Sequence, residues 1–488
     1  MKILFTTAEV SPIAKTGGLG DVCGSLPKAL AKLGHDVVIF MPYYRQAREW
    51  FASNGVTLEE ALPAAHVLWA DWAAQAEYFR TTLPGTDIPL ILVGNDYYFR
   101  RPHIYSPRFD GYDDGIDRYT FFCRAVIRGC ELLGIAPDIV HAHDWHTALL
   151  PIYLHSGLRG TDQFRGARSV YTIHNLNYQG IGAYDHFRGF GLHSRYWAPD
   201  ALEHFGDVNL MKGGIILADQ VTTVSPSYAR EIQTSEHGAG LDGVLRSLSF
   251  KLKGILNGID VEEWDPETDP HLRSHFRQDR LAGKNLSKRA LLRELKLPLK
   301  AKTPLLSFIS RLADQKGIDL LVAALPQMLA AGAQAVILGS GEPPYENALQ
   351  QIAARYPDSC RVIIGFDSDL AHRIYAGADM LLMPSLYEPC GLNQMYALRY
   401  GTVPVVRLTG GLADTVIPYN GANLDAATGF GFFSANAADF YTAAWLAMLN
   451  YREPKTWKRL QANGMAADFS WERSAREYEA VYARALSS

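Results

Sequence analysis

The sequence predicts an α/β protein built from two doubly wound domains, and two observations lead to this fold class. Short, continuously apolar runs recur along the chain and alternate with helical patterns, which is typical of parallel strands buried on both faces of a sheet. The same rhythm occurs twice in the 488 residues, once before and once after residue 250. Each half of the chain can therefore form its own Rossmann-like sheet and core.

The first domain is predicted to span residues 1–250. Each of its expected strands is followed by Gly or polar residues and then by a helical pattern, as in successive β-α units. These strands, in order, are residues 2–6, 37–41, 90–93, 138–141, 170–173 and 221–224.

The second domain is predicted over residues 251–468, and a helix is expected after it. The strands expected in this domain are residues 254–256, 305–309, 335–338, 362–364, 380–383 and 403–406. The last segment, residues 469–488, carries Tyr478, Val481, Tyr482 and Ala485 at helical spacing. We expect this segment to be a helix that packs back on the first domain.

The composition argues against several classes of protein. Lys and Arg number 47 against 51 Asp and Glu, a formal charge of −4, whereas a nucleic-acid-binding domain is normally basic. The five cysteines are odd in number and form no C-x-x-C pair, which argues against disulfides and zinc–thiolate sites. The N-terminal apolar stretch is too short for a signal peptide, and no apolar run reaches the ~18 residues of a membrane span. We therefore expect a cytoplasmic protein without nucleic-acid or membrane partners.

Glycine-rich turns occur at two equivalent places. Residues 16–21 (TGGLGD) are echoed by residues 409–414 (TGGLAD), and each segment follows an expected strand and precedes an expected helix. Glycine pairs at such a turn let backbone N–H groups approach an anion, and Lys15 adds a point charge. Asp21 and Asp414 would also suit helix N-caps, so the echo has a purely structural explanation as well. The first turn is not a P-loop, and it lacks the ribose-binding acid of a dinucleotide site.

Histidines cluster at the ends of two expected strands of the first domain. The segment HAHDWH begins at His141 and places Asp144 at the carboxyl end of its strand. His141 and His143 would share one strand face, but no matching ligand cluster accompanies them in the sequence, so we expect no metal ion and no cofactor. His174 follows the next strand and reaches the same edge, where the structural alternative is a hydrogen-bonded loop histidine.

Basic and acidic residues end two strands of the second domain. Arg311 and Lys316 lie on the loop after the strand at 305–309, where a guanidinium fork and an ammonium group can converge on a diphosphate. Glu388 follows the strand at 380–383 and precedes an expected helix. Its carboxylate is suited to bonding sugar hydroxyls or, alternatively, to capping that helix.

The candidate residues of both domains all fall on loops at the carboxyl edges of two separate sheets. A set of this kind can meet on one ligand only if the two domains face each other across a cleft. Its members are Lys15, Asp144, His174, Arg311, Lys316, Glu388, Gly410 and Gly411.

The sequence resembles bacterial glycogen synthases and plant starch synthases, which are family 5 glycosyltransferases. The match runs from residue 2 to about residue 482, and the combination of a K-x-G-G-L start with an E-P-C-G-L loop is very specific to this family. The motifs that carry it are residues 15–21, 141–146, 172–176, 255–260, 310–312, 315–317, 387–392 and 409–412. The resemblance implies the GT-B fold. It also implies transfer of glucose from ADP-glucose to the 4-hydroxyl end of an α-1,4-glucan or maltooligosaccharide, with retention.

The resemblance also implies roles for individual residues. The diphosphate would be held by Lys15, Gly18, Arg311 and Lys316, with help from the amides of Leu392, Gly410 and Gly411. His174 and Glu388 would grip the transferred glucose, and Asp144 and Asn257 would lie around the sugar and the acceptor. The remaining residues expected at the donor are Asp21, Cys390, Gly391 and Thr409.

Two positions depart from the pattern of related enzymes. Many relatives have Thr where this chain has Asn393, and we expect a small effect because both side chains can cap or hydrogen-bond. In the wider group of retaining GT-B enzymes a second Glu often lies eight residues after the first, and here that position is Tyr396. Glu388 is therefore expected to work without that partner.

The expected chemistry follows from the leaving group. Negative charge builds up on the bridging phosphate oxygen, where Arg311, Lys316 and Lys15 would stabilise it. The sequence shows no obvious nucleophile–acid pair of carboxylates, so we expect attack on the same face, with the leaving phosphate taking the acceptor's proton. The alternatives are a related enzyme with UDP-glucose or another acceptor, an NAD-dependent oxidoreductase, and a non-catalytic glycan-binding protein.

Overall fold

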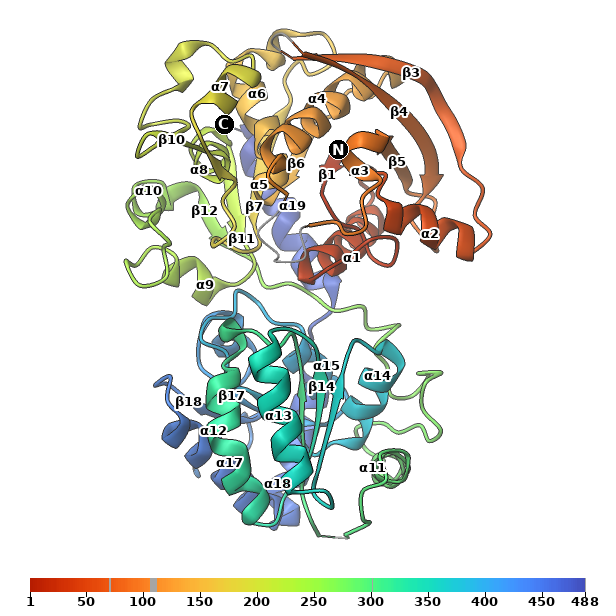
Figure 1. Ribbon diagram of the computed structural model, residues 1–488, viewed down its shortest axis with the longest axis vertical. Coiled ribbons are helices and arrows are strands. Elements are labelled where there is room, and N and C mark those ends of the chain that lie inside the picture. Colours follow the sequence, from red (N-terminus) through yellow and green to blue (C-terminus); the bar gives the residue numbers. More distant parts are fainter. Residues whose placement is uncertain (70–71, 106–111, 301, 488) are drawn as a thin grey trace. The chain divides into compact units, whose positions relative to one another are not determined.

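The chain forms two compact units in a computed structural model that describes residues 1–69, 72–105, 112–300 and 302–487 (Figure 1). The first unit comprises Met1–Gly258 together with Trp471–Ser488, and the second comprises Ile259–Ser470. The chain therefore passes from the first unit to the second and returns for its last helix.

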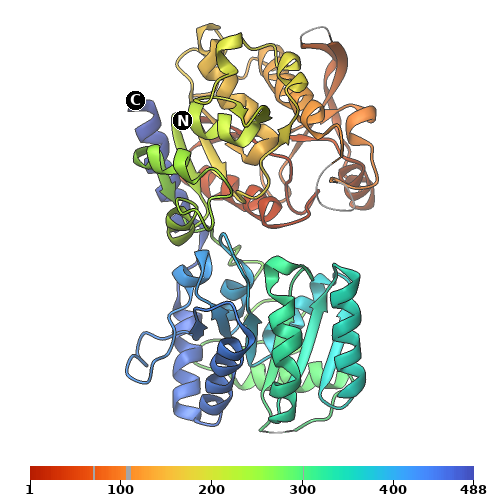
Figure 2. The same cartoon turned by 60° about the vertical axis from the view of Figure 1, so that its left-hand side comes forward.

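The first unit is built on a nine-stranded sheet with the order β12-β11-β7-β6-β1-β2-β5-β4-β3. The strands from β12 to β5 pair in parallel, and their apolar side chains are buried because helices cover both faces (Figure 2). All six strands expected here are present, as β1 (Lys2–Thr6), β2 (Asp36–Pro42), β5 (Pro89–Gly94), β6 (Ile139–His143), β7 (Arg168–Ile173) and β11 (Gln220–Thr223).

Five further strands of the first unit were not expected. β3 (Glu59–Trp69) and β4 (Trp72–Thr82) form a long antiparallel hairpin at one edge of the sheet. Their pattern of exposed and buried residues lacks the continuous apolar run of a central strand. A separate three-stranded sheet is made of β8 (Ile181–Gly182), β9 (Glu203–His204) and β10 (Asp207–Asn209).

The boundary between the units differs from the one expected at residue 250. The first strand of the second domain was expected at residues 254–256, but the strand found there is β12 (Leu252–Gly254), which pairs with β11 in the first sheet. Because this pairing holds the chain on the first unit, the division falls after Gly258. The second division falls after Ser470, two residues later than expected.

Helices pack on both faces of the first sheet. The last helix, α19, packs against α1 and β7, and its Tyr482 hydroxyl lies 2.9 Å from Nδ1 of His141. The other face carries α4 and α6. The helices of this unit are α1 (Gly18–Lys32), α2 (Arg45–Ser53), α3 (Asp96–Phe99), α4 (Gly115–Leu133), α5 (Asp144–Thr147), α6 (Leu149–Ser156), α7 (Asp185–Gly189), α8 (Leu210–Leu217), α9 (Pro226–Glu231), α10 (Asp242–Ser247) and α19 (Trp471–Ser487).

The second unit contains a six-stranded, wholly parallel sheet with the order β15-β14-β13-β16-β17-β18. Five of these strands were expected from their apolar runs, and β18 was not. They are β13 (Leu305–Ile309), β14 (Gln334–Gly339), β15 (Cys360–Ile364), β16 (Met380–Met383), β17 (Val403–Arg407) and β18 (Phe430–Phe432).

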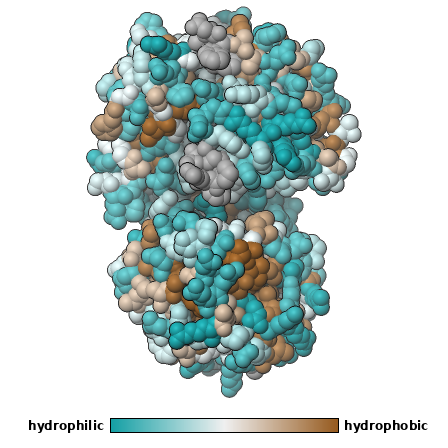
Figure 3. Space-filling model, viewed as in Figure 1, coloured by the Kyte–Doolittle hydropathy of each residue, from teal (hydrophilic) through white to brown (hydrophobic). Residues whose placement is uncertain are grey.

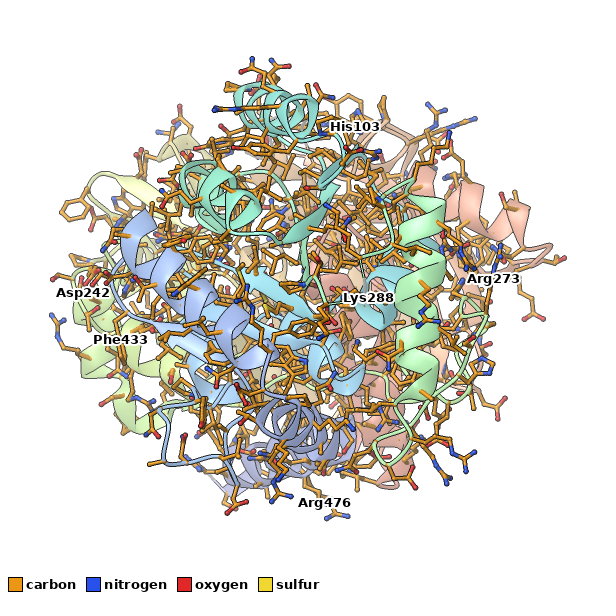
Figure 4. All side chains as sticks on the ribbon, turned by 90° about the horizontal axis from the view of Figure 1, so that it is seen from below. His103, Asp242, Arg273, Lys288, Phe433 and Arg476 are labelled. Atoms are coloured by element: carbon orange, nitrogen blue, oxygen red, sulfur yellow. The ribbon has the colours of Figure 1, made fainter. Side chains whose placement is uncertain are left out.

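Helices cover both faces of the second sheet, and a buried ion pair ties one of them to a strand (Figure 4). Lys288 of α11 lies between that helix and the sheet, with its Nζ 2.5 Å from Oδ2 of Asp379. By contrast, Phe433 lies near the outer edge of this unit and is 75% exposed. The helices of this unit are α11 (Ala282–Glu294), α12 (Ile318–Ala330), α13 (Pro343–Arg355), α14 (Ser368–Gly377), α15 (Asn393–Arg399), α16 (Gly410–Thr415), α17 (Ala437–Tyr451) and α18 (Pro454–Ala466).

The surface is ordinary for a globular protein. On the face seen in Figure 3, hydrophilic residues predominate and hydrophobic residues occur in small groups. Within the described part of the chain, no helix is both long and apolar enough to cross a bilayer.

Candidate active site

Both units place their candidate residues at the point where the sheet topology reverses. Numbered in chain order within each unit, the parallel strands of the second sheet follow the doubly wound order 3-2-1-4-5-6, and those of the first sheet follow the same order with β12 added as a seventh strand. Ligands of such sheets bind beyond the carboxyl ends of the two central strands. These strands are β1 and β6 in the first unit, and β13 and β16 in the second. The loops that follow them carry Lys15, Asp144, Lys316 and Glu388.

The glycine-rich loop of the first unit runs from β1 into α1. Gly17 is the N-cap residue of α1, so Asp21 lies in the first turn and is not the cap that its position suggested. The Asp21 side chain instead accepts a hydrogen bond from Nζ of Lys15 at 2.6 Å. Gly18 opens the helix, and a methyl group there would meet no neighbouring atom within 4 Å. The second turn also opens a helix, with Thr409 as the N-cap of α16 and Asp414 within the helix.

Glu9 organises this loop, and it was not among the residues expected at the site. The N–H groups of Thr16 and Gly17 donate to Oε2 of Glu9 at 2.6 and 3.2 Å. The hydroxyls of Thr16 and Tyr105 donate to Oε1 at 2.8 and 2.7 Å. Burial raises the pKa of Glu9, and these hydrogen bonds oppose the rise. Two loop amides that seemed available to an anion are therefore already bonded to a carboxylate.

Asp144 and His174 meet at the edge of the same sheet. The backbone N–H of His174 donates to Oδ1 of Asp144 at 2.7 Å, and the N–H of Asn175 lies 3.4 Å from the same oxygen. Asp144 adopts a left-handed backbone conformation with φ of 53°, which Asp and Asn tolerate better than other side chains. Burial raises the pKa of Asp144 to about 7 even though these amides favour its charged form. The pair is thus buried and joined by hydrogen bonds, and its carboxyl group can change its charge near neutral pH.

Two of the three histidines of the HAHDWH segment, His141 and His143, lie behind this edge. Nδ1 of His141 lies 2.9 Å from the Tyr482 hydroxyl, and Nε2 lies 2.7 Å from the Thr172 hydroxyl, so both ring nitrogens are used within the protein. Nδ1 of His143 lies 2.9 Å from Nε2 of His174. Burial lowers the pKa of all three histidines, that of His174 to about 3, and all three rings are therefore neutral at pH 7.

In the second unit, a cation and a carboxylate from two loops are in direct contact. Nζ of Lys316 lies 2.6 Å from Oε2 of Glu388, which also accepts a hydrogen bond from the Ser385 hydroxyl at 3.0 Å. Arg311 is on the same loop as Lys316, and its Nη2 lies 3.4 Å from Oε1 of Gln315. The structure thus brings Lys316 and Glu388 together, although 72 residues separate them in the sequence, and Arg311 lies on the same loop as Lys316.

Two glycines, Gly410 and Gly411, allow the loop that carries Glu388 to pack against the start of α16. A β-carbon at Gly410 would lie 1.9 Å from the carbonyl oxygen of Glu388, and one at Gly411 would lie 2.0 Å from that of Cys390. The Gly411 N–H already donates to the Glu388 carbonyl at 3.0 Å. The Gly411 amide therefore holds the Glu388 loop in this structure, and its expected contact with phosphate stays a prediction.

The remaining expected residues surround these contacts. Leu392 is the N-cap of α15, Gly391 before it has a φ of 72°, and the Asn393 side chain donates to the carbonyl of Ile309 at 2.6 Å. This bond ties the start of α15 to the end of β13. Tyr396, at the position of the missing second carboxylate, stacks on Trp264 at a centroid distance of 3.9 Å and thus has a packing role.

Asn257 belongs to the first unit, although the sequence placed it in the second domain. Its side chain is buried, and its Oδ1 has no hydrogen-bond partner among the residues that the structure describes. A buried amide oxygen without a partner is costly, which marks this position as one that a ligand can satisfy.

One group of side chains in the second unit has the residue types of a metal site. Ligand atoms of Asp269, His271 and His372 lie within 4.8 Å of one another. However, Oδ1 of Asp269 already accepts the His271 N–H at 2.8 Å, and Oδ2 contacts Nδ1 of His372 and the Tyr400 hydroxyl at 2.8 and 2.6 Å. Three hydrogen bonds from the protein already reach this carboxylate, so the group is explained as a structural hydrogen-bond network.

A cavity of about 980 Å³ in the first unit lies away from these residues. It is lined by β3 and by the last turns of α4 and α6, which lead into the amino ends of β6 and β7. Ligand sites of doubly wound sheets lie at the opposite ends of the strands. We therefore do not assign this cavity to the candidate site.

Comparisons with known proteins agree with this arrangement. A family described as "Starch synthase catalytic domain" matches residues 2–247, and one described as "Glycosyl transferases group 1" matches residues 294–464. A glycogen synthase of Thermotoga maritima is 44% identical, with 100% of this chain and 99% of the relative covered. One of Cellvibrio japonicus is 45% identical, with 99% of each chain covered.

Two solved structures resemble the chain over its whole length. The catalytic domain of starch synthase IV from Arabidopsis thaliana, solved bound to ADP and acarbose, is 35% identical and superimposes with a TM-score of 0.90. The match covers 100% of this chain and 99% of that one. A sucrose-phosphate synthase from Thermosynechococcus elongatus is 18% identical with a TM-score of 0.60 and the same coverage, which is a likeness of fold.

Proposed function

The chain belongs to the glycogen synthase and starch synthase family of glycosyltransferases with the GT-B fold, and on this premise we propose a specific reaction. The protein transfers glucose from ADP-glucose to the non-reducing 4-hydroxyl of an α-1,4-glucan, and it retains the anomeric configuration. ADP as the nucleotide is supported by the related starch synthase IV, which was solved with ADP bound.

The contact between Lys316 and Glu388 carries this proposal. In a nucleotide sugar the phosphate is bonded directly to the anomeric carbon of the sugar, so a cation for the phosphate and a carboxylate for the sugar hydroxyls must lie close together. Nζ of Lys316 and Oε2 of Glu388 are 2.6 Å apart, beyond the ends of the central strands of their sheet. A dinucleotide reductase or a simple glycan-binding protein has no need of that pairing.

Each charged group has a task in the proposed reaction. As the glycosidic bond breaks, charge develops on the leaving diphosphate, and Arg311 and Lys316 stabilise it more strongly than the ground state. We propose that Lys15 of the first unit contributes to the same diphosphate. Glu388 accepts hydrogen bonds from the glucose hydroxyls once the Lys316 ammonium group has left it to bind the phosphate.

The first unit supplies the remaining groups. We propose that His174 and Asp144 bind the transferred glucose and the incoming acceptor. The side-chain oxygen of Asn257 accepts a hydrogen bond from a nearby hydroxyl group of these sugars. In the proposed complex the Glu388 carboxylate accepts hydrogen bonds from Ser385 and from the glucose hydroxyls, which makes it a poor nucleophile. Attack on the same face, with the leaving phosphate taking the acceptor's proton, follows as the route to retention. A trapped glucosyl–Glu388 or glucosyl–Asp144 adduct would overturn this route.

One assay tests the reaction. The purified protein is incubated with maltotetraose and either ADP-glucose or UDP-glucose, and nucleoside diphosphate release and glucan length are followed together. We expect longer glucans with ADP-glucose, a lower rate with UDP-glucose, and only α-linked product in proton NMR spectra. Equal or faster reaction with UDP-glucose would refute the donor assignment, and a β-linked product would refute retention.

A further inference from the structure

His143 is buried directly behind His174, and no role in the proposed reaction has been given to it so far. It is the last residue of β6 and pairs with Thr172 of the neighbouring strand β7, which delivers His174 to the same edge. Its backbone is fixed on both sides, because its N–H donates to the Thr147 hydroxyl at 2.6 Å and its carbonyl accepts from that hydroxyl at 2.9 Å. Its ring nitrogen Nδ1 lies 2.9 Å from Nε2 of His174.

The hydrogen bond between these rings can run in two directions. Because burial lowers the pKa of both histidines, each ring is neutral and carries one N–H and one lone pair. Either Nδ1–H of His143 donates to Nε2 of His174, or Nε2–H of His174 donates to Nδ1 of His143. In the first case the remaining proton is on Nδ1 of His174. In the second case it is on Nε2 of His143.

The surroundings of His143 distinguish these cases. Its other nitrogen, Nε2, is buried and has no hydrogen-bond partner among the described residues. If His174 donated, His143 would have to carry its proton on this Nε2, as a buried N–H without an acceptor. Buried N–H groups without a partner are rarer than buried acceptors without one. The favoured arrangement therefore has the His143 proton on Nδ1, where it bonds to His174.

We propose that His143 is a positioning residue that holds His174 as the tautomer protonated on Nδ1. The lone pair of the His174 Nε2 is then occupied by His143, and its Nδ1–H is left as a hydrogen-bond donor for a ligand. The carboxylate of Asp144 already accepts the backbone N–H of His174, so this residue is held by Asp144 at its backbone and by His143 at its ring. If His174 binds glucose as proposed above, the bound sugar atom is a hydroxyl oxygen that accepts from this N–H.

The tautomer can be measured without any substrate. Long-range proton–nitrogen NMR correlations of protein labelled with nitrogen-15 in histidine distinguish Nδ1–H from Nε2–H rings, and His174→Gln identifies the His174 signals by their loss. We expect the Nδ1–H tautomer of His174 in the wild-type protein and a mixture of tautomers in His143→Leu. A wild-type His174 protonated on Nε2 would overturn the proposal.

Activity gives a second readout through a matched pair of variants. Leu and Asn have nearly the same size, but only Asn offers an amide that can replace the hydrogen bond of the His143 ring. With ADP-glucose and maltotetraose, we expect His143→Leu to lower kcat about tenfold, the worth of one hydrogen bond, and His143→Asn to recover most of that loss. Equal losses in the two variants, with unchanged thermal unfolding, would show that the side-chain hydrogen bond has no role.

This inference rests on the proposed function only for the identity of the ligand. If the wild-type protein transferred no glucose from ADP-glucose, the proposed function would fail. The NMR experiment would still decide whether His143 sets the tautomer of His174.

Discussion

Nζ of Lys316 lies 2.6 Å from Oε2 of Glu388, and only 16% and 6% of the two side chains are exposed. The cation proposed for the phosphate and the carboxylate proposed for the sugar thus neutralise each other in this structure. A buried pair of this kind is costly to break from one side, because the remaining charge stays buried. A nucleotide sugar can replace both halves of the contact at once, by giving its phosphate to Lys316 and its hydroxyls to Glu388.

Removing the lysine alone should therefore harm both stability and activity. We expect Lys316→Met to lower the free energy of unfolding by at most about 3–5 kcal/mol, because Glu388 keeps only its bond from Ser385. Glucosyl transfer should fall by on the order of 10²–10³. The double variant Lys316→Met/Glu388→Gln should regain most of the stability but none of the activity. Guanidinium unfolding and the transfer assay measure the two effects, and a double variant no more stable than the single one would contradict the ion-pair argument.

Asp144 should make both stability and activity depend on pH. Its pKa is raised to about 7 by burial, whereas an unfolded aspartate titrates near ~4. Between these values the native state keeps a proton that the unfolded state has lost. The contribution of Asp144 to the free energy of unfolding therefore decreases as the pH rises from about 4 to about 7.

The variant Asp144→Asn removes this titration. Asn is uncharged, can still accept the His174 N–H, and tolerates the φ of 53°. We expect the variant to unfold at a higher temperature than the wild type at pH 8, with a smaller difference at pH 5. Its transfer activity should be about 10²-fold lower, if the charged form serves the reaction. Wild-type activity that did not rise with pH towards about 8 would argue against a role for the ionised carboxylate.

The central strands were predictable because of their surroundings. β13 and β16 have the predicted bounds because both faces of each strand are covered, so their apolar runs are continuous. The edge hairpin of β3 and β4 has no such run, since many of its side chains are exposed. β12 was assigned to the wrong unit because an apolar run reveals a strand but not the partner with which it pairs.

The sequence could nominate residues for the site but not their contacts. Arg311, Lys316 and Glu388 were predicted because charged groups after buried strands point to a carboxyl edge. The contact of Lys316 with Glu388 could not be found, because the sheet order that brings β13 beside β16 is a long-range property. Glu9 was missed for a related reason. Its carboxylate bonds backbone amides, and such bonds leave no residue pattern in the sequence.

Glu9 provides a test of how the glycine-rich loop is held. An amide in place of the carboxylate has only one accepting oxygen, so Glu9→Gln must lose bonds to Thr16 or Gly17. We expect the free energy of unfolding to fall by about 1–3 kcal/mol and kcat/KM for the donor to fall about tenfold. Tyr105→Phe removes one bond to Glu9 without touching the loop and should have a smaller effect on kcat/KM. Similar losses in the two variants would argue that the loop does not depend on Glu9.

The close approach of Gly410 to the Glu388 loop can be separated from its backbone conformation. Gly410 and Gly421 both have positive φ values, 47° and 90°, so an alanine at either position is strained by about 1–2 kcal/mol. Only at Gly410 would the new methyl group also collide, at 1.9 Å from the backbone oxygen of Glu388, whereas nothing lies within 4 Å at Gly421. The two variants therefore share the strain and differ in the collision.

We expect Gly421→Ala to show the strain alone, with unchanged glucosyl transfer. Gly410→Ala should lose more stability, because a backbone oxygen cannot move aside as a flexible side chain can. It should also lose about 10²-fold in activity, since a displacement of the Glu388 loop by about 1 Å is enough to misplace a catalytic group. Thermal unfolding and the transfer assay on both variants measure the difference. If Gly410→Ala kept its activity, the loop would be able to shift without moving the Glu388 carboxylate, and the packing of α16 would have no part in placing that carboxylate.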